Sequence, residues 1–193
     1  MPNVTPWIEF QVAQEVDEFN AFWNSPENAL SFDDAEALSG PIGNVFLSSQ
    51  TNPLNITSAN LGKDFPDPFV LLGVEVEVRG GWTGASQGLR SVFLRAIIGE
   101  QVRQELGSGS LPLTVAGAFI KGGPTDTMNL SVADLMDPAF GFQLWGTTTT
   151  FNINGNILHI DSVRLRLHWD QPGSSGGAGR GRTRAAFTRG ALA

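Results

Sequence analysis

The sequence predicts an all-β protein, an antiparallel jelly-roll-like β-sandwich with extended N- and C-terminal arms. Short apolar runs are separated by clusters of Gly, Pro, Asn, Asp and Ser, as strands and turns require. Between residues 74 and 79, valines alternate with charged residues, which is the period of a strand with one buried face. Helical signal is confined to short stretches. The three observations together favour a sandwich over any helical or α/β fold.

The chain begins with a segment, residues 1–20, that is predicted to be an edge strand containing Trp7, Ile8, Phe10 and Val12. We expect it to join the protein's own sheet, and the alternative is a strand swapped onto a neighbouring copy. The stretch 33–38 could form one further helical turn. In the strand 68–79, valines should face the core and charges should face solvent, namely Val74, Val76 and Val78 against Glu75, Glu77 and Arg79.

The second half of the chain predicts three further strands and one short helix. The strands are 91–98, 140–151 and 156–169, and the β-branched run 147–150 suits the second of them. Ser131 is a plausible helix N-cap, with Asp134 three residues later and Pro138 ending the helix. In the last strand the apolar residues change phase, so a β-bulge near Ser162 would bring both sets to the core. The glycines at 80–81 and 107–109 are expected in hairpin turns.

Residues 21–170 are therefore predicted to form the sandwich, and residues 171–193 a Gly/Arg-rich C-terminal arm. The arm contains four of the 12 basic residues and no acidic residue, which leaves 8 basic and 19 acidic residues in the rest of the chain. It has too few apolar side chains to fold alone. We expect it to bind a partner through charge-assisted contacts and apolar anchors, and the alternative is a solubilising linker. The predicted partner-binding residues are Arg180, Arg182, Arg184, Phe187, Arg189 and Leu192.

Composition argues against most catalytic and cofactor chemistry. There is no cysteine, so disulfides and thiolate chemistry are ruled out. Two histidines without any cysteine provide too few of the usual ligands for a zinc site. No phosphate-binding loop, calcium loop or nucleophile elbow is present, and the paired carboxylates are typical of an acidic surface. We expect no enzyme activity, no catalytic residue, no metal and no cofactor.

Charge and hydropathy also limit the expected partners. The acidic body lacks the basic face that nucleic-acid binding needs, and no apolar run is long enough to span a membrane. The N-terminus lacks the basic start and apolar core of a signal peptide, so we expect synthesis in a cytoplasm. Glycan binding stays open, because tryptophans on loop tips or a sheet face can stack on sugars. Trp82, in a Gly-rich stretch, is the main candidate glycan-binding residue, and Trp145 and Trp169 are further candidates.

Three stretches, in order, resemble a β-sandwich domain of tailed-bacteriophage virion proteins. The first is FWNSPENA at 22–29 with DDA at 33–35, and the second is FP at 65–66 leading to LGVEVEV at 72–78. The third is GGPTD at 122–126 with SVADLMDPAFGF at 131–142, followed by IDSVRLRL at 160–167. The chain departs from that pattern at Met128-Asn129-Leu130, where the family has Leu-Trp-Gly, and at His168-Trp169, where it has tyrosines.

This resemblance implies a non-enzymatic virion structural protein. The most favoured role is a capsid cement or decoration protein that stabilises the major-capsid lattice. Its partners would be the major capsid protein or other virion proteins, and it would form a homo-oligomer on the particle after synthesis in the host cytoplasm. The alternatives are a tail, baseplate or connector component and a host-glycan-binding module.

Overall fold

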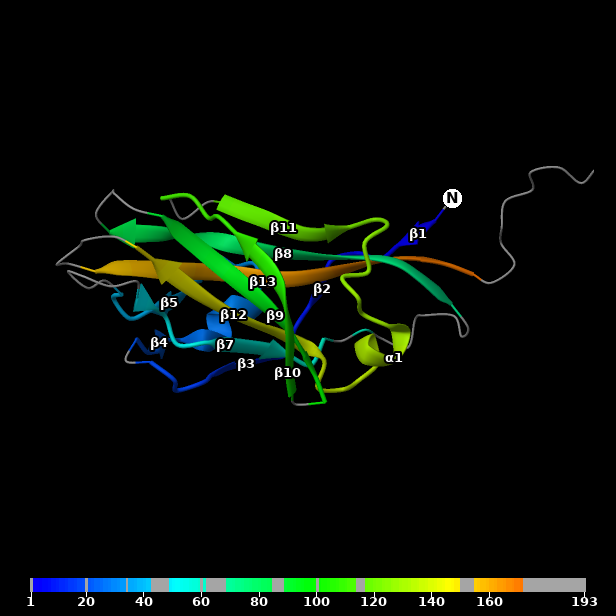
Figure 1. Ribbon diagram of the computed structural model, residues 1–193, viewed down its shortest axis with the longest axis horizontal. Helices are drawn as coiled ribbons and strands as arrows, with labels where there is room; N and C mark the ends of the chain where they lie inside the picture. Colours follow the sequence, from blue (N-terminus) through cyan, green and yellow to red (C-terminus); the bar gives the residue numbers. More distant parts are fainter. Residues whose placement is uncertain are drawn as a thin grey trace, which may run out of the picture.

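The computed structural model contains two antiparallel sheets packed face to face, with very little helix (Figure 1). It describes residues 2–19, 21–33, 35–42, 49–59, 61, 69–84, 89–99, 101–113, 117–149 and 155–171. The predicted all-β sandwich is confirmed. Within these ranges no helix is long and apolar enough to cross a membrane.

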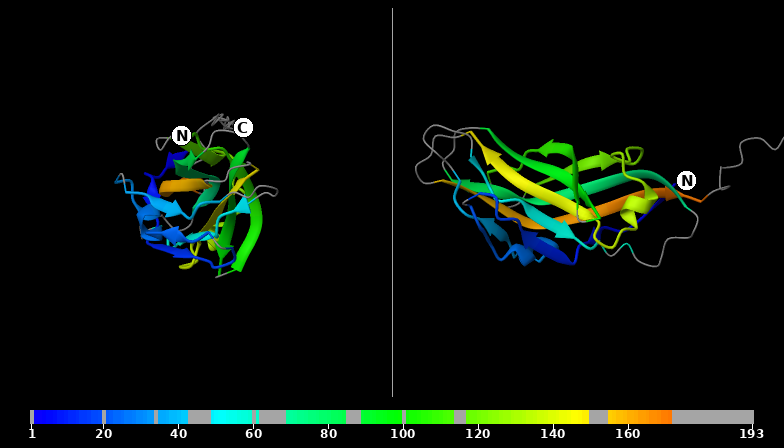
Figure 2. Two further views of the ribbon diagram at one scale, coloured as in Figure 1. Left: turned by 90° about the vertical axis from the view of Figure 1, so that its left-hand side faces the viewer. Right: turned by 60° about the horizontal axis from the view of Figure 1, so that its bottom comes forward.

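The seven-stranded sheet has the strand order β11-β8-β13-β5-β4, and β1 and β2 also pair with β13. Its strands are β1 (Asn3–Val4), β2 (Ile8–Glu9), β4 (Trp23–Asn24), β5 (Ala37–Ser39), β8 (Val70–Gly84), β11 (Gly117–Gly123) and β13 (Asn156–Asp170). The two longest strands, β8 and β13, run side by side along the molecule, as the right-hand view of Figure 2 also shows.

The six-stranded sheet has the strand order β10-β9-β12-β7-β3, and β6 also pairs with β12. Its strands are β3 (Val12–Glu15), β6 (Ser49–Gln50), β7 (Leu54–Thr57), β9 (Arg90–Ile98), β10 (Gln101–Gly109) and β12 (Gly141–Thr148). The pairing is nested, since β8 pairs with β13 in one sheet and β9 with β12 in the other. Nested pairs that alternate between two sheets give the sandwich its jelly-roll character.

The first fifteen residues contribute strands to both sheets. β1 and β2 pair with β13, whereas β3 pairs with β7 across the sandwich. The segment therefore joins the protein's own sheets, as the sequence favours. Two short helices complete the described structure, the 3₁₀ helix η1 (Pro26–Leu30) and α1 (Val132–Leu135).

Alternation along β8 and β13 builds the core. Val74, Val76 and Val78 have no exposed surface, and the bulge expected near Ser162 is present as a register shift between Ile160 and Ser162. Because the bulge changes the phase of the strand, apolar residues on both sides of it are buried, namely Leu158, Ile160, Val163, Leu165 and Leu167. Gly146 of β12 makes room for a core ring, since a Cβ there would lie 2.6 Å from Trp82 Cη2.

Two turn expectations fail. Gly80 and Gly81 lie inside β8, and residues 107–109 lie inside β10, so neither pair of glycines forms a hairpin turn. Gly80 has a φ of 152°, and a Cβ there would lie 2.0 Å from the carbonyl oxygen of His159. Glycine is thus needed at residue 80 for close approach of β13, and the strand continues through it.

The helix α1 begins with a capping box, as its sequence predicts. Ser131 Oγ accepts a hydrogen bond from the Asp134 amide, and Asp134 Oδ2 accepts bonds from the Ser131 amide and hydroxyl. The Ser131 hydroxyl, and then its backbone amide, hold the pKa of the Asp134 carboxyl below its ordinary value.

We expect Ser131→Ala to destabilise the protein by about 1 kcal/mol, because it removes the cap. It should also raise the pKa of Asp134 towards the ordinary value. Since the folded-state pKa is the lowered one, this stabilisation is present above the ordinary pKa and disappears as the pH falls through the lowered value. NMR titration of the Asp134 carboxyl in both proteins measures the effect. An unchanged pKa in the variant would contradict the assignment.

Candidate functional site: the outer face of the six-stranded sheet

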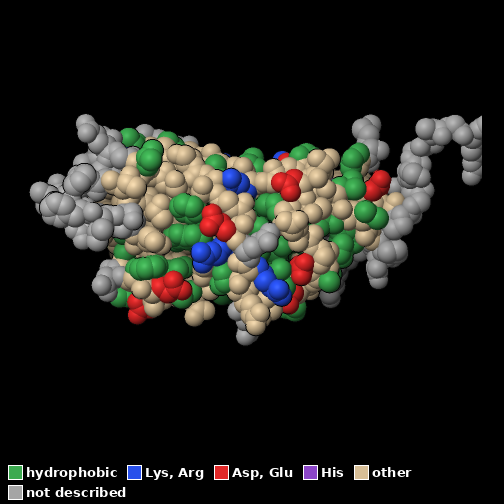
Figure 3. All heavy atoms as spheres, in the orientation of Figure 1, with side chains coloured by type: hydrophobic (Ala, Val, Ile, Leu, Met, Phe, Trp, Pro, Cys, Tyr) green, Lys and Arg blue, Asp and Glu red, His purple; other side chains and the backbone are tan. Residues whose placement is uncertain are grey.

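The outer face of the six-stranded sheet is formed by side chains that alternate with core residues. In β12, Phe142 and Leu144 are fully buried between the sheets, so Gln143 and Trp145 project to the other side. In β9, Leu94 and Ala96 face the core, and Phe93 and Arg95 project outwards. β9, β10 and β12 lie in front of β8 and β13 in Figure 1, so Figure 3 looks onto this outer face.

Strand register places five hydrogen-bonding side chains in one line across this face, one from each of five neighbouring strands. The line, called the polar row below, follows the register pairs from β10 to β3: Glu105, Arg95, Gln143, Asn55 and Gln14. Directly opposite residues in neighbouring strands share a face and have Cβ atoms about 5 Å apart. The polar row is therefore a continuous strip of planar polar groups across the sheet.

Contacts fix the centre of the polar row. Gln143 Nε2 donates a hydrogen bond to Asn55 Oδ1 at 3.0 Å, and Gln143 is only 3% exposed. The Arg95 guanidinium lies 4.4 Å from the centroid of the Trp145 ring, and Trp145 stacks on Phe93 at a centroid distance of 5.2 Å. Stacking holds the guanidinium plane in one orientation, so its donors are positioned before any ligand arrives.

A hollow of about 440 Å³ adjoins the row at its β3–β7 end. It is lined by Gln14 and Asn55 of the polar row and by Thr57, Ser58, Ile97, Pro138 and Ala139. In the next register row, Gly141 lies between Ile97 and Thr57, and the β7 backbone approaches it closely, since a Cβ there would lie 2.0 Å from the Ile56 carbonyl oxygen. A ligand could thus contact the polar row and enter a recess beside it.

The chemistry of this face is polar with little net charge. Arg95 and Glu105 face each other across the β9–β10 pair, and the other three members of the row are neutral amides. Amides both donate and accept hydrogen bonds, as hydroxyl groups do. Figure 3 shows both acidic and basic side chains on this face, lying among hydrophobic and uncharged groups. The arrangement matches an uncharged ligand rich in hydroxyl groups.

The outer face of the seven-stranded sheet is different, because its charged groups pair with one another. Arg164 binds Glu77 and Arg166 binds Glu75, across the β8–β13 pair. The Trp7 ring covers both guanidinium groups, with centroid distances of 5.4 Å and 4.4 Å. Glu75 and Glu77 are only 7% and 9% exposed, so the expectation that they face open solvent is wrong. The alternation along β8 does point both side chains away from the core. They are nevertheless shielded from water, because each pairs with an arginine that the Trp7 ring covers.

A third polar group joins distant parts of the chain. His159 Nδ1 lies 2.9 Å from Glu36 Oε2, and His159 Nε2 lies 2.7 Å from Thr83 Oγ1. The order hydroxyl, imidazole, carboxylate is that of a hydrolytic triad. A triad also needs donors placed to stabilise an oxyanion beside the hydroxyl. Together the three side chains tie the segment before β5 to β8 and β13.

The glycan-binding role expected for Trp82 is wrong. Its side chain has no exposed surface and lies in the core against Gly146. The reason is that β8 does not turn at Gly80 but continues to Gly84, so residue 82 stays in phase with the buried valines. Trp145 does lie on a sheet face, 7% exposed, and Trp169 packs edge-to-face on Phe69.

The predicted partner-binding residues all lie outside the described residues. These are Arg180, Arg182, Arg184, Phe187, Arg189 and Leu192. Among the described residues, no group of three or more His, Asp or Glu side chains is arranged to hold a metal ion. The polar row was missed by sequence reasoning, although the alternation of Phe142, Gln143, Leu144 and Trp145 already places a Gln and a Trp on one outer face.

Comparison with known proteins identifies no family. No family model matches the chain, and no curated protein matches it. Among solved structures, the chain is similar to a low-affinity xylan-binding module from the xylanolytic gut symbiont Roseburia intestinalis. The identity is 7% and the TM-score 0.31, over 88% of this chain and 96% of that one. A likeness this distant does not bear on function, and the resemblance to phage virion domains gains no support from these comparisons.

Proposed function

We propose that this protein is a non-enzymatic binding module that recognises a neutral glycan through the outer face of its six-stranded sheet. The observation that carries the proposal is the polar row, a register-aligned line of planar hydrogen-bonding side chains beside a hollow of about 440 Å³. Binding sites combine a recess with a small number of convergent polar groups. The polar row and its hollow meet this description on one rigid sheet.

The charge distribution favours an uncharged sugar over an acidic one. Outside the arm, 8 basic residues face 19 acidic ones, so a sulfated or uronic-acid polymer meets general repulsion. Within the row, the charge of Arg95 is balanced by Glu105 across the strand pair. Sugar hydroxyls can instead exchange donors and acceptors with Asn55 and Gln14 without bringing a charge to the site. Gln143, which is only 3% exposed, holds the Asn55 amide in place through their hydrogen bond.

Rigidity of the site, more than aromatic stacking, should supply the affinity. Trp145 is 7% exposed, because Phe93 and Arg95 lie against its ring, so it has little area to offer a sugar. Its role in the proposal is to hold Arg95 in place, which reduces the entropy lost on binding. The expected affinity for a single short oligosaccharide is therefore modest. Several copies on one surface would raise it through avidity.

An array of immobilised neutral, uronic-acid and sulfated glycans tests the proposed class. The full-length protein should bind one or more neutral glycans, and the binding should persist at high salt because exposed charge pairs do not carry it. Retention on acidic glycans alone, lost as salt is added, would contradict the proposal. Binding to no glycan on a broad array would contradict it as well.

A second candidate function is a bacteriophage virion structural protein, such as a capsid cement or tail component. It is favoured by the ordered motifs at 22–35, 65–78 and 122–167 and by the composition break at Gln171, which gives the chain a basic arm. In that setting the partners are the major capsid protein or other copies on the particle. Counting copies per particle by quantitative mass spectrometry separates the roles, since a cement protein follows the capsid lattice and a tail component does not.

A further inference from the structure

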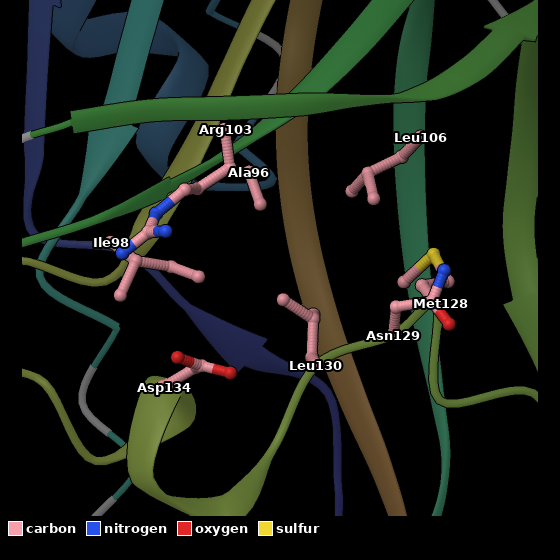
Figure 4. A pocket seen from close by; sticks show the side chains of 8 residues that line it. All are labelled: Ala96, Ile98, Arg103, Leu106, Met128, Asn129, Leu130 and Asp134. Carbon is pink, nitrogen blue, oxygen red and sulfur yellow. The ribbon is translucent and has the colours of Figure 1, made fainter.

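A cavity of about 350 Å³ opens between the β9–β10 hairpin and the loop before α1 (Figure 4). Its walls are apolar and come from both sheet and loop: Ala96, Ile98, Leu106, Met128 and Leu130. The volume is at the lower end of the range for binding pockets and suits one large apolar side chain. It is separate from the polar row.

Charged groups line the side of the cavity nearest α1. Arg103 and Asp134 belong to the lining, and Figure 4 shows both facing the open space. Two further carboxylates lie in the adjoining loops: Asp126 Oδ1 accepts the Met128 amide at 2.8 Å, and Asp137 Oδ1 accepts the Ala139 amide at 2.7 Å. These three carboxylates outnumber the two nearby cations, Arg103 and Lys121, whose Nζ lies beside Gly107, so the region has a net negative charge that favours a basic segment.

The cavity wall contains strained backbone. Met128 and Asn129 are consecutive residues with positive φ angles of 51° and 57°. A left-handed conformation is unfavourable for methionine, and such outliers gather at ligand sites. The Asp126 carboxylate holds this turn through the Met128 amide. The turn brings the flexible Met128 side chain into the wall, where a thioether can adapt to an inserted side chain.

We propose that this cavity receives Phe187 of the protein's own C-terminal arm, while the flanking Arg184 and Arg189 contact the carboxylates around it. The arm is basic and free of acidic residues, which complements the acidic loops. Phe187 is the arm's largest apolar side chain, with arginines three residues before and two residues after it. The proposal is independent of glycan binding.

The geometry of β13 gives the arm the necessary reach. β13 ends at Asp170, and Leu167 pairs with Val74, whose amide donates to the Asp126 carbonyl oxygen at 2.8 Å. The end of β13 and the cavity loop thus lie on neighbouring strands at the same end of the sandwich. Sixteen residues separate Asp170 from Phe187. An extended chain of this length spans about 50–60 Å, which exceeds the few strand spacings to the cavity.

The chain has no cysteine, so one engineered cysteine can carry the only spin label. It has three methionines, so the methyl signal of Met128 can be followed in the whole chain. A nitroxide on Ala186→Cys should abolish the ¹³C-methyl signal of Met128, because the label broadens only nearby nuclei. The methyl signals of Ile42, which pairs with Asn156 at the opposite end of β13, should stay in place. High salt should restore the Met128 signal, since arginine–carboxylate contacts at the surface are screened. Equal broadening of the Met128 and Ile42 signals at low salt would overturn the proposal.

Paired variants distinguish docking from chance proximity. Leu106→Trp fills the cavity and should restore the Met128 signal, whereas Leu113→Trp, at a 48%-exposed position, should not. Phe187→Ser in the labelled chain should restore it too. In a further control, chains that carry the nitroxide but no ¹³C are mixed with chains that carry ¹³C but no nitroxide. The Met128 signal of the ¹³C chains should then show no loss. Loss in this mixture would mean that the arm comes from another copy, which overturns the assignment to the protein's own arm.

Discussion

Val78→Asp is expected to leave no stably folded protein. Val78 has no exposed surface and lies between Phe119 and Val163 in the seven-stranded sheet, so neither register partner can neutralise a carboxylate. Burying an unpaired charge costs several kcal/mol even after its pKa shifts. A domain of this kind has a total stability of about 5–15 kcal/mol.

The same substitution at an exposed position is the control for this prediction. Val12 of β3 is 43% exposed, so Val12→Asp should keep its far-UV circular dichroism spectrum and nearly its melting temperature. Urea unfolding followed by circular dichroism measures both variants. A cooperative transition for Val78→Asp at the wild-type midpoint would show that the valine face of β8 does not form the core.

The double substitution Gln143→Leu with Asn55→Leu is expected to remove glycan binding and to preserve the fold. The two side chains hydrogen-bond each other, so replacing both leaves neither amide unpaired at the centre of the polar row. The sugar loses the Asn55 amide as a partner, and the row loses the Gln143 side chain that holds this amide in place. We expect at least a tenfold loss of affinity, which corresponds to about 1.4 kcal/mol.

Matched substitutions outside the polar row show whether the loss is specific. Gln101→Leu with Asn24→Leu makes the same chemical change at two exposed positions, one at the start of β10 and one in the edge strand β4. This control should bind as the wild type does. Calorimetry with the best glycan from the array gives both affinities. Equal binding by the two double variants would exclude the polar row as the binding surface.

Several features of the fold could be predicted because each depends on residues that are close together in the sequence. The alternation of valines predicts one buried face of β8, formed by Val74, Val76 and Val78. The phase change near Ser162 predicts a bulge, and Ser131 is predicted to be a helix N-cap. The structure confirms each prediction. Trp82 was misplaced because glycines usually mark turns, whereas Gly80 is needed here for close approach of β13.

The candidate site could not be predicted in the same way. Gln14 and Gln143 are far apart in the sequence, and only the register of β3, β7 and β12 aligns them. Register depends on the whole buried face and on the turns, and a shift of one residue would send each side chain to the other face. The same holds for Glu75 and Glu77, whose cover by Trp7 and the β13 arginines depends on the N-terminal strands.

NMR of the side-chain amides tests most directly the claim that this sheet face binds the glycan. Adding the oligosaccharide identified on the array should shift the NH₂ signals of Gln143, Asn55 and Gln14, along with backbone amides around the hollow. The backbone amides of β11, at the edge of the other sheet, should stay unchanged. Shifts that cluster over β8, β11 and β13 instead, with the three side-chain amides unmoved, would show that the glycan does not bind the outer face of the six-stranded sheet.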